Sequence, residues 1–214
     1  MKTLAMSLAV AFSLILSARM AVADDLQPIE GDQARAIAER LVQEANKIEK
    51  PQIKIDADAQ KANGVHSPGK LGIMVVPQKD LKESEELAAK FKTEKGASLA
   101  YLFMYHIVPV IDGKPIETSQ LRSVKLIGDN GAEHIVYVLL LAVRQPAEDE
   151  YRLHAYGHLD KPLVDAKFAE VSSSGAEPVA CDIKDPNEQT LQGKLVVTVF
   201  GKYQASFQCG YKPD

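Results

Sequence analysis

Two stretches of the chain are almost continuously apolar, residues 97–111 and residues 134–143. Neither alternates between apolar and polar positions, and this pattern is typical of strands that are covered on both faces. We therefore expect both stretches to be central strands of one sheet. A shorter apolar run at residues 71–76, closed by Pro77, predicts another strand, and the alternation of residues 53–56 predicts a short one.

Two amphipathic helices are predicted in the first half of the chain. The first has apolar residues at spacings of three and four, with Asp32 as its N-cap and Pro51 as its stop. The second covers residues 80–91, with Asp80 as its cap and Gly96 after its end. The order strand, helix, strand over residues 71–108 fits either a parallel crossover or an antiparallel arrangement.

The second half has the pattern of an antiparallel meander. Asp112-Gly113 and Asn130-Gly131 are tight-turn pairs between apolar runs, residues 151–158 alternate, and residues 195–209 form a hairpin in which we expect Phe200 to pair with Tyr203. Helices early and antiparallel strands later predict an α+β fold: mainly antiparallel β-sheet, or a two-layer β structure, with both helices packed on one face. The other face then needs a second layer of strands or another subunit, as in a homodimer.

The N-terminus has the pattern of a secretory signal. A lysine at position 2 precedes an apolar run at residues 4–16, and Ala21-Val22-Ala23 is a typical cleavage site. We expect residues 1–23 to be removed, residues 24–214 to form one domain, and the protein to be secreted or periplasmic, without stable membrane insertion. The mature chain carries 23 basic and 29 acidic side chains, a net charge of about −6, which argues against a nucleic-acid partner.

Cys181 and Cys209 are the only cysteines. In an oxidising compartment an isolated pair usually forms a disulfide, so we expect a bridge that clamps the C-terminal part of the domain. The sequence has no C-x-x-C pair, and this makes a redox role the weaker interpretation.

Four histidines, His106, His134, His154 and His158, fall in predicted strands and are candidates for a zinc or copper site. His154 and His158 would lie about 13 Å apart on a strand, too far to bind one ion. In a helix they would be one turn apart and could bind together. We favour the strand, and with it structural or surface roles for these histidines and no resident cofactor.

The sequence does not define a specific activity. It contains none of the G-x-S-x-G, H-E-x-x-H or S-x-x-K signatures of hydrolases, so a catalytic role has no support from motifs. The tyrosines and Met104 of the predicted sheet suit a site for a small apolar ligand. We therefore expect an exported, non-catalytic binding or structural domain whose partner is a protein or a small apolar ligand. A histidine-dependent metal protein or enzyme is the alternative.

Overall fold

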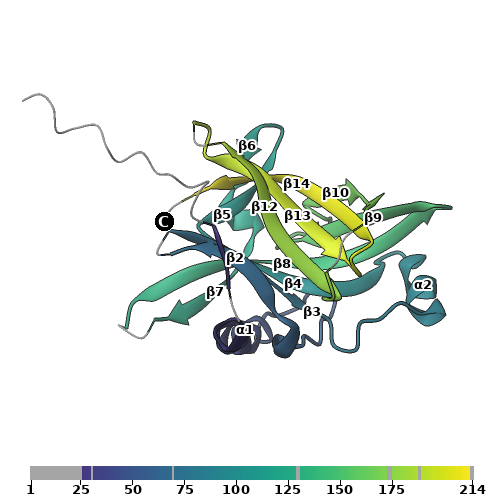
Figure 1. Ribbon diagram of the computed structural model, residues 1–214, viewed down its shortest axis with the longest axis horizontal. Coiled ribbons are helices and arrows are strands. Elements are labelled where there is room, and N and C mark those ends of the chain that lie inside the picture. The colour runs from purple at the N-terminus through teal and green to yellow at the C-terminus, as the bar shows by residue number, and fades with distance from the viewer. Residues whose placement is uncertain are drawn as a thin grey trace, which may run out of the picture.

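Two antiparallel sheets make up most of the molecule (Figure 1). The computed structural model describes residues 26–29, 31–68, 70–128, 131–172, 175–187 and 189–212, so the predicted signal sequence lies outside the described residues. The larger sheet has the order β1 (Gln27–Pro28), β2 (Asn63–Ser67), β3 (Leu71–Pro77), β4 (Ala97–Tyr105), β8 (Glu133–Ala147), β9 (Glu150–Tyr156) and β10 (Val164–Lys167), and β7 (Arg122–Ile127) also pairs with β8. The smaller sheet has the order β12 (Val179–Asn187), β13 (Gln192–Val199), β14 (Tyr203–Tyr211), β5 (Ile107–Ile111) and β6 (Lys114–Pro115), and β11 (Ala169–Glu170) also pairs with β14.

The two predicted central strands pair with each other. β4 runs antiparallel to β8, with Leu102 opposite Leu139. Both leucines and the next residue of β8, Leu140, are fully buried. β3 pairs with β4 antiparallel as well, which decides the open question of the strand, helix, strand segment. The mainly antiparallel α+β prediction is therefore confirmed at this level.

The apolar run at residues 97–111 is two strands in different sheets, where one strand was expected. It is interrupted at His106, whose φ of 55° lies in the left-handed region. Tyr105 ends β4 in the larger sheet, and Ile107 begins β5, which pairs with β14 in the smaller sheet. One left-handed residue therefore carries the chain from one sheet to the other.

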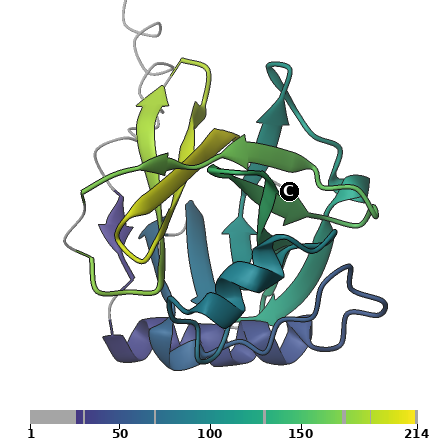
Figure 2. The same ribbon diagram turned by 90° about the vertical axis from the view of Figure 1, so that its right-hand side faces the viewer.

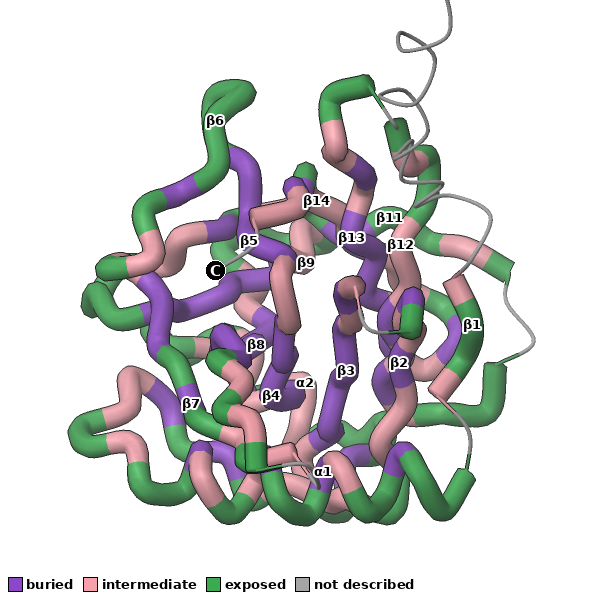
Figure 3. The backbone as a smooth tube through the Cα atoms, turned by 90° about the vertical axis from the view of Figure 1, so that its left-hand side faces the viewer, coloured by how far each residue is buried: buried purple, intermediate pink, exposed green. Residues whose placement is uncertain are grey.

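Two apolar cores lie on opposite faces of the larger sheet. One joins the sheets, with Ile73, Leu102 and Leu139 on one side and Leu195 and Val197 on the other. The second core lies under α1 (Gly31–Ala45), whose buried side chains Ala34, Ala38, Leu41 and Ala45 pack with apolar residues of β3, β4, β7 and β8. Figure 3 shows the buried strand segments in purple, with α1 running below them.

The two helices do not share a face of the sheet, and the prediction that they do is wrong. α2 (Glu85–Phe91) packs Leu87 and Phe91 against the core between the sheets, whereas α1 packs against the other core. Figure 2 shows the short α2 in front of the molecule and α1 along its lower edge. The apolar stripe of each helix correctly predicted that one side of the helix is buried. It did not indicate which face of the larger sheet the helix packs against.

Several local predictions also need correction. α2 is capped by Ser84, whose Oγ accepts a hydrogen bond from the backbone N–H of Leu87, and not by Asp80. α1 begins at Gly31, so Asp32 lies in its first turn. The segment 53–56 buries Ile53 and Ile55 without forming a strand, and β2 was not predicted because it is polar. Two 3₁₀ turns, Ala59–Lys61 and Thr118–Gln120, complete the described helical elements.

The last hairpin is shifted by one residue from the predicted register. Val199, and not Phe200, is opposite Tyr203, because Phe200 and Gly201 both adopt positive φ in the turn. The side chains of Leu195, Val197 and Val199 consequently face the core between the sheets. None of the described helices is long and apolar enough to cross a membrane.

Candidate functional site

The four candidate metal ligands do not come together. His106 and His134 both contact the ring of Tyr105, the first stacked at 3.9 Å between ring centroids and the second edge-on at 5.6 Å. His154 lies on β9, and His158 follows that strand and donates its backbone N–H to the carbonyl of Gln120. Within the described residues no group of three or more His, Cys, Asp and Glu side chains could hold a metal ion.

His154 has a structural environment. It is 4 % exposed, with Nδ1 at 3.3 Å from the Tyr156 hydroxyl and Nε2 at 3.3 Å from an Asp165 carboxylate oxygen. Burial lowers the pKa of His154, and the nearby Asp165 carboxylate only partly opposes this effect. A neutral imidazole that donates to Asp165 therefore describes this contact better than an ion pair.

Cys181 and Cys209 are free, so the predicted disulfide is wrong. Cys181 is opposite Val197 of β13, and Cys209 is opposite Gly193 of the same strand. Four residues along a strand and two strand spacings across place their Cα atoms roughly 16 Å apart, whereas a disulfide needs less than about 7 Å. Burial raises the pKa of the Cys181 thiol to about 12 and that of the Cys209 thiol to about 11, so both are weak nucleophiles.

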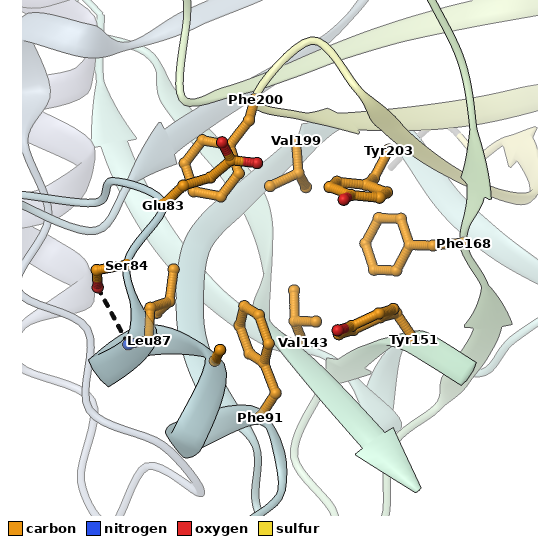
Figure 4. Close-up of a pocket in the computed structure, with 11 residues that line it drawn as sticks. Glu83, Ser84, Leu87, Phe91, Val143, Tyr151, Phe168, Val199, Phe200 and Tyr203 are labelled. Atoms are coloured by element: carbon orange, nitrogen blue, oxygen red, sulfur yellow. Dashed lines mark hydrogen bonds between the residues drawn. The ribbon is translucent and has the colours of Figure 1, made fainter. Parts of the chain in front are cut away.

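A pocket lined by aromatic side chains opens where the core between the sheets reaches the surface beside α2 (Figure 4). We call it the aromatic pocket. Its volume is about 220 Å³. Five aromatic rings line it, from α2, both sheets and the segments beside them: Phe91, Tyr151, Phe168, Phe200 and Tyr203. Val143 and Val199, which belong to the buried core, also contribute to its lining.

Local structure holds the rings in place. Phe91, at the end of α2, meets Tyr151 of β9 edge-to-face, with centroids 5.8 Å apart and planes at 85°. Tyr151 in turn lies 6.2 Å from Tyr203 of β14, so ring contacts connect α2, the larger sheet and the smaller sheet. Phe168, 8 % exposed, lies between the two tyrosines in Figure 4. These contacts order an apolar wall before any ligand arrives.

Two phenol hydroxyls add polar groups to this otherwise apolar wall. Figure 4 shows the rings of Tyr151 and Tyr203 entering from the same side, with both hydroxyl oxygens directed into the pocket. Neither hydroxyl has a hydrogen-bond partner among the described residues, and both side chains are only half-buried. Each can therefore donate to an acceptor on a molecule that fills the pocket.

An ion pair crosses the rim of the pocket. Lys202, in the turn before β14, donates to Glu83, just before α2, at 2.6 Å. This hydrogen bond raises the pKa of Lys202. Glu83 is the only carboxylate among the described residues that line the pocket, and it accepts a hydrogen bond from this lysine. Ser84 is likewise engaged, because its Oγ caps α2.

The sequence pointed to tyrosines of the sheet but missed most of this lining. Met104, proposed as part of a ligand site, is fully buried in the core between the sheets. Phe91 was expected on the apolar face of a helix and Phe200 opposite Tyr203 in the last hairpin, but no pattern placed these rings together or beside Phe168. They meet because segments distant along the chain converge at one end of the core, and this long-range arrangement leaves no local pattern.

Comparisons with family models, curated proteins and solved structures found nothing that matches this chain.

Proposed function

We propose that this protein is an exported, non-catalytic binding protein that takes one small, flat, largely apolar molecule into the aromatic pocket. The observation that carries the proposal is the pocket lining: five aromatic rings around a preformed cavity, with two phenol hydroxyls directed inward. Sites of this kind bind by apolar contact and use a few polar groups to fix orientation.

The size of the cavity limits the ligand. Because a cavity of about 150 Å³ holds benzene, a cavity of about 220 Å³ has room for about nine non-hydrogen atoms. One six-membered ring with a short substituent fits this limit. The T-shaped pair Phe91 and Tyr151 and the tilted pair Tyr151 and Tyr203 offer faces and edges against which such a ring packs favourably.

The charges favour a neutral ligand over a cation. Aromatic cages also bind quaternary ammonium groups. Here, however, the carboxylate of Glu83 is already paired, and the ammonium group of Lys202 lies at the same rim. An entering cation would be repelled by the Lys202 ammonium group and would find the Glu83 carboxylate already paired. A neutral ring with a hydrogen-bond acceptor instead meets the hydroxyls of Tyr151 and Tyr203, which have no partner among the described residues.

A titration with two ring compounds tests this proposal. Acetophenone and isopropylbenzene have nearly the same shape, but only acetophenone carries an acceptor. We expect both to shift NMR signals of the pocket residues, with acetophenone binding about three to ten times more tightly, as one hydrogen bond predicts. The double variant Tyr151→Phe and Tyr203→Phe should remove this preference.

A variant that fills the pocket supplies the control. Ala88 on α2 lines the pocket, and Ala88→Leu should weaken both ring compounds at least tenfold while the protein stays folded. If neither compound shifts the pocket signals up to its solubility limit, or if Ala88→Leu leaves binding unchanged, the proposal is wrong.

A further inference from the structure

A second cavity lies on the opposite face of the larger sheet, beneath the N-terminal half of α1. We call it the helix–sheet pocket. Its volume is about 250 Å³, and α1 contributes Gln33, Ile37 and Leu41 to its lining. In Figure 3, α1 runs below β2, β3, β4 and β7, whose residues complete the pocket together with β8.

A glycine lies in the wall of this pocket. Gly72 of β3 is paired with His66 of β2 on one side and with Tyr105 of β4 on the other. It belongs to the face of β3 that also carries Met74 and Val76, both in the core under α1. A Cβ atom built at Gly72 would lie 3.4 Å from the Cβ of His66, and its three nearest atoms all belong to β2, so a larger side chain at this position would take up space in the pocket that Gly72 lines.

The walls are apolar, and the polar groups gather at the strand ends. Met74, Phe103, Val136 and Leu126 supply apolar surface opposite Ile37. β4 and β8 add Tyr105 and His134, whose hydroxyl and Nδ1 lie 3.2 Å apart. The other polar residues of the lining are Gln33 of α1 and His66 and Ser67 of β2. Among the described residues, neither the His66 ring nor His134 Nε2 has a hydrogen-bond partner.

These polar groups are not arranged for a metal ion. His66 is on β2 and His134 is on β8, three strand spacings apart, which is about 14 Å between backbones. Among the described lining residues, these two imidazole rings can each donate an N–H hydrogen bond to an acceptor. No carboxylate is among those lining residues, so nothing in the described lining repels an anionic head group that accepts hydrogen bonds from these rings.

We propose that the helix–sheet pocket binds a short aliphatic carboxylate, with its chain between α1 and the sheet and its head group between His66 and His134. By the same volume argument, about 250 Å³ holds about ten non-hydrogen atoms, the size of an eight-carbon fatty acid. This site is independent of the aromatic pocket, because the two lie on opposite faces of the larger sheet and share no lining residue.

The test is a titration with octanoate and with octanol, followed by the imidazole and methyl NMR signals. We expect octanoate to shift the ring signals of His66 and His134 and to bind at least fivefold more tightly than octanol. Gly72→Leu should weaken octanoate at least tenfold. Ala88→Leu, which fills the aromatic pocket, should leave octanoate binding unchanged.

Two further variants keep the test decisive if Gly72→Leu does not fold. His66→Ala and His134→Ala remove only half-buried polar side chains and should each reduce octanoate affinity toward that of octanol. Octanoate that binds but is lost in Ala88→Leu overturns the assignment to this pocket. Equal affinities for octanoate and octanol overturn the carboxylate assignment, and the absence of any imidazole shift overturns the site.

Discussion

At the residue scale, His106 directs the chain from the larger sheet into the smaller one. A left-handed conformation costs a residue other than glycine about 1–3 kcal/mol, so it persists only where its surroundings impose it. Here the ring stacks on Tyr105, Nδ1 lies 2.6 Å from the carbonyl oxygen of Lys70, and the His106 carbonyl accepts a hydrogen bond from the Lys212 N–H. A histidine that looked like a metal ligand in the sequence is therefore the corner between the two sheets.

Substitutions at this corner should be ranked by their tolerance of positive φ. Asparagine adopts the left-handed region readily, whereas a β-branched residue does not. We expect His106→Val to lower the free energy of unfolding by about 1–2 kcal/mol more than His106→Asn does. Urea denaturation of both variants measures this difference, and equal losses would show that the ring contacts, and not the backbone, decide stability at this position.

The buried His154 makes stability depend on pH. Burial lowers its pKa from the ordinary value of 6.5, so the unfolded chain binds the proton more strongly than the folded one. The stability contributed by the neutral ring is complete above pH 6.5 and is lost as the pH falls from there through the lowered pKa of the folded state.

Replacing this histidine should remove the pH dependence from that window. In His154→Gln, which cannot be protonated, we expect the free energy of unfolding to change less between pH 7 and pH 5.5 than in the wild type. Chemical denaturation at several pH values gives both slopes. A variant slope as steep as that of the wild type would assign the pH dependence to other groups.

At the element scale, the short helix α2 determines the shape of the aromatic pocket. Seven residues are too few for a helix to be stable alone, so α2 depends on its Ser84 cap and on the packing of Leu87 and Phe91. The ion pair between Lys202 and Glu83 adds a link from the start of this helix to the hairpin of the smaller sheet. Both partners are exposed, so the pair matters more for the mouth of the pocket than for the fold.

Removing the rim ion pair should therefore change ligand exchange. We expect Lys202→Met to leave the thermal midpoint almost unchanged and to raise the dissociation rate of acetophenone several-fold, because the mouth is no longer bridged. Line-shape analysis of the ligand signals measures the rate. The matched control is Lys90→Met, which removes the pair of Lys90 with Glu86 on the same helix, away from the pocket lining. Equal rates in both variants would contradict this role.

Elements were predictable where the burial pattern is strong and local. The runs that became β3, β4 and β8 are apolar on both faces, and Asp112-Gly113 takes positive φ at both positions, as a tight turn requires. β2 was missed because its residues are mostly polar and the sheet places two of them at a pocket. The aromatic pocket could not be predicted, because its lining comes from both sheets and depends on how these sheets are placed against each other. That placement is not visible in the sequence, where β4 and β5 form one continuous apolar run across the corner at His106.

At the scale of the whole molecule, one apolar core holds the two sheets together, and no disulfide contributes because both cysteines are free. Val179, Cys181 and Cys209 of the smaller sheet lie in the same apolar cluster as Ile73 and Leu139 of the larger one. Both cysteines act there as small apolar side chains. Packing between the sheets, and not a cross-link, therefore has to keep the smaller sheet in place.

This arrangement predicts that reducing agents leave stability unchanged. Because Cys181 is 7 % and Cys209 3 % exposed, and because burial raises the pKa of both thiols, neither should react with a thiol reagent in the native protein. In denaturant, both should react. We expect the same urea midpoint with and without dithiothreitol, and a mass that rises by two alkylations only after unfolding. A midpoint that falls in dithiothreitol, or a denatured chain that resists alkylation, would mean that Cys181 and Cys209 are bridged within the smaller sheet after all, and that the C-terminal strands adopt a different register from the one described here.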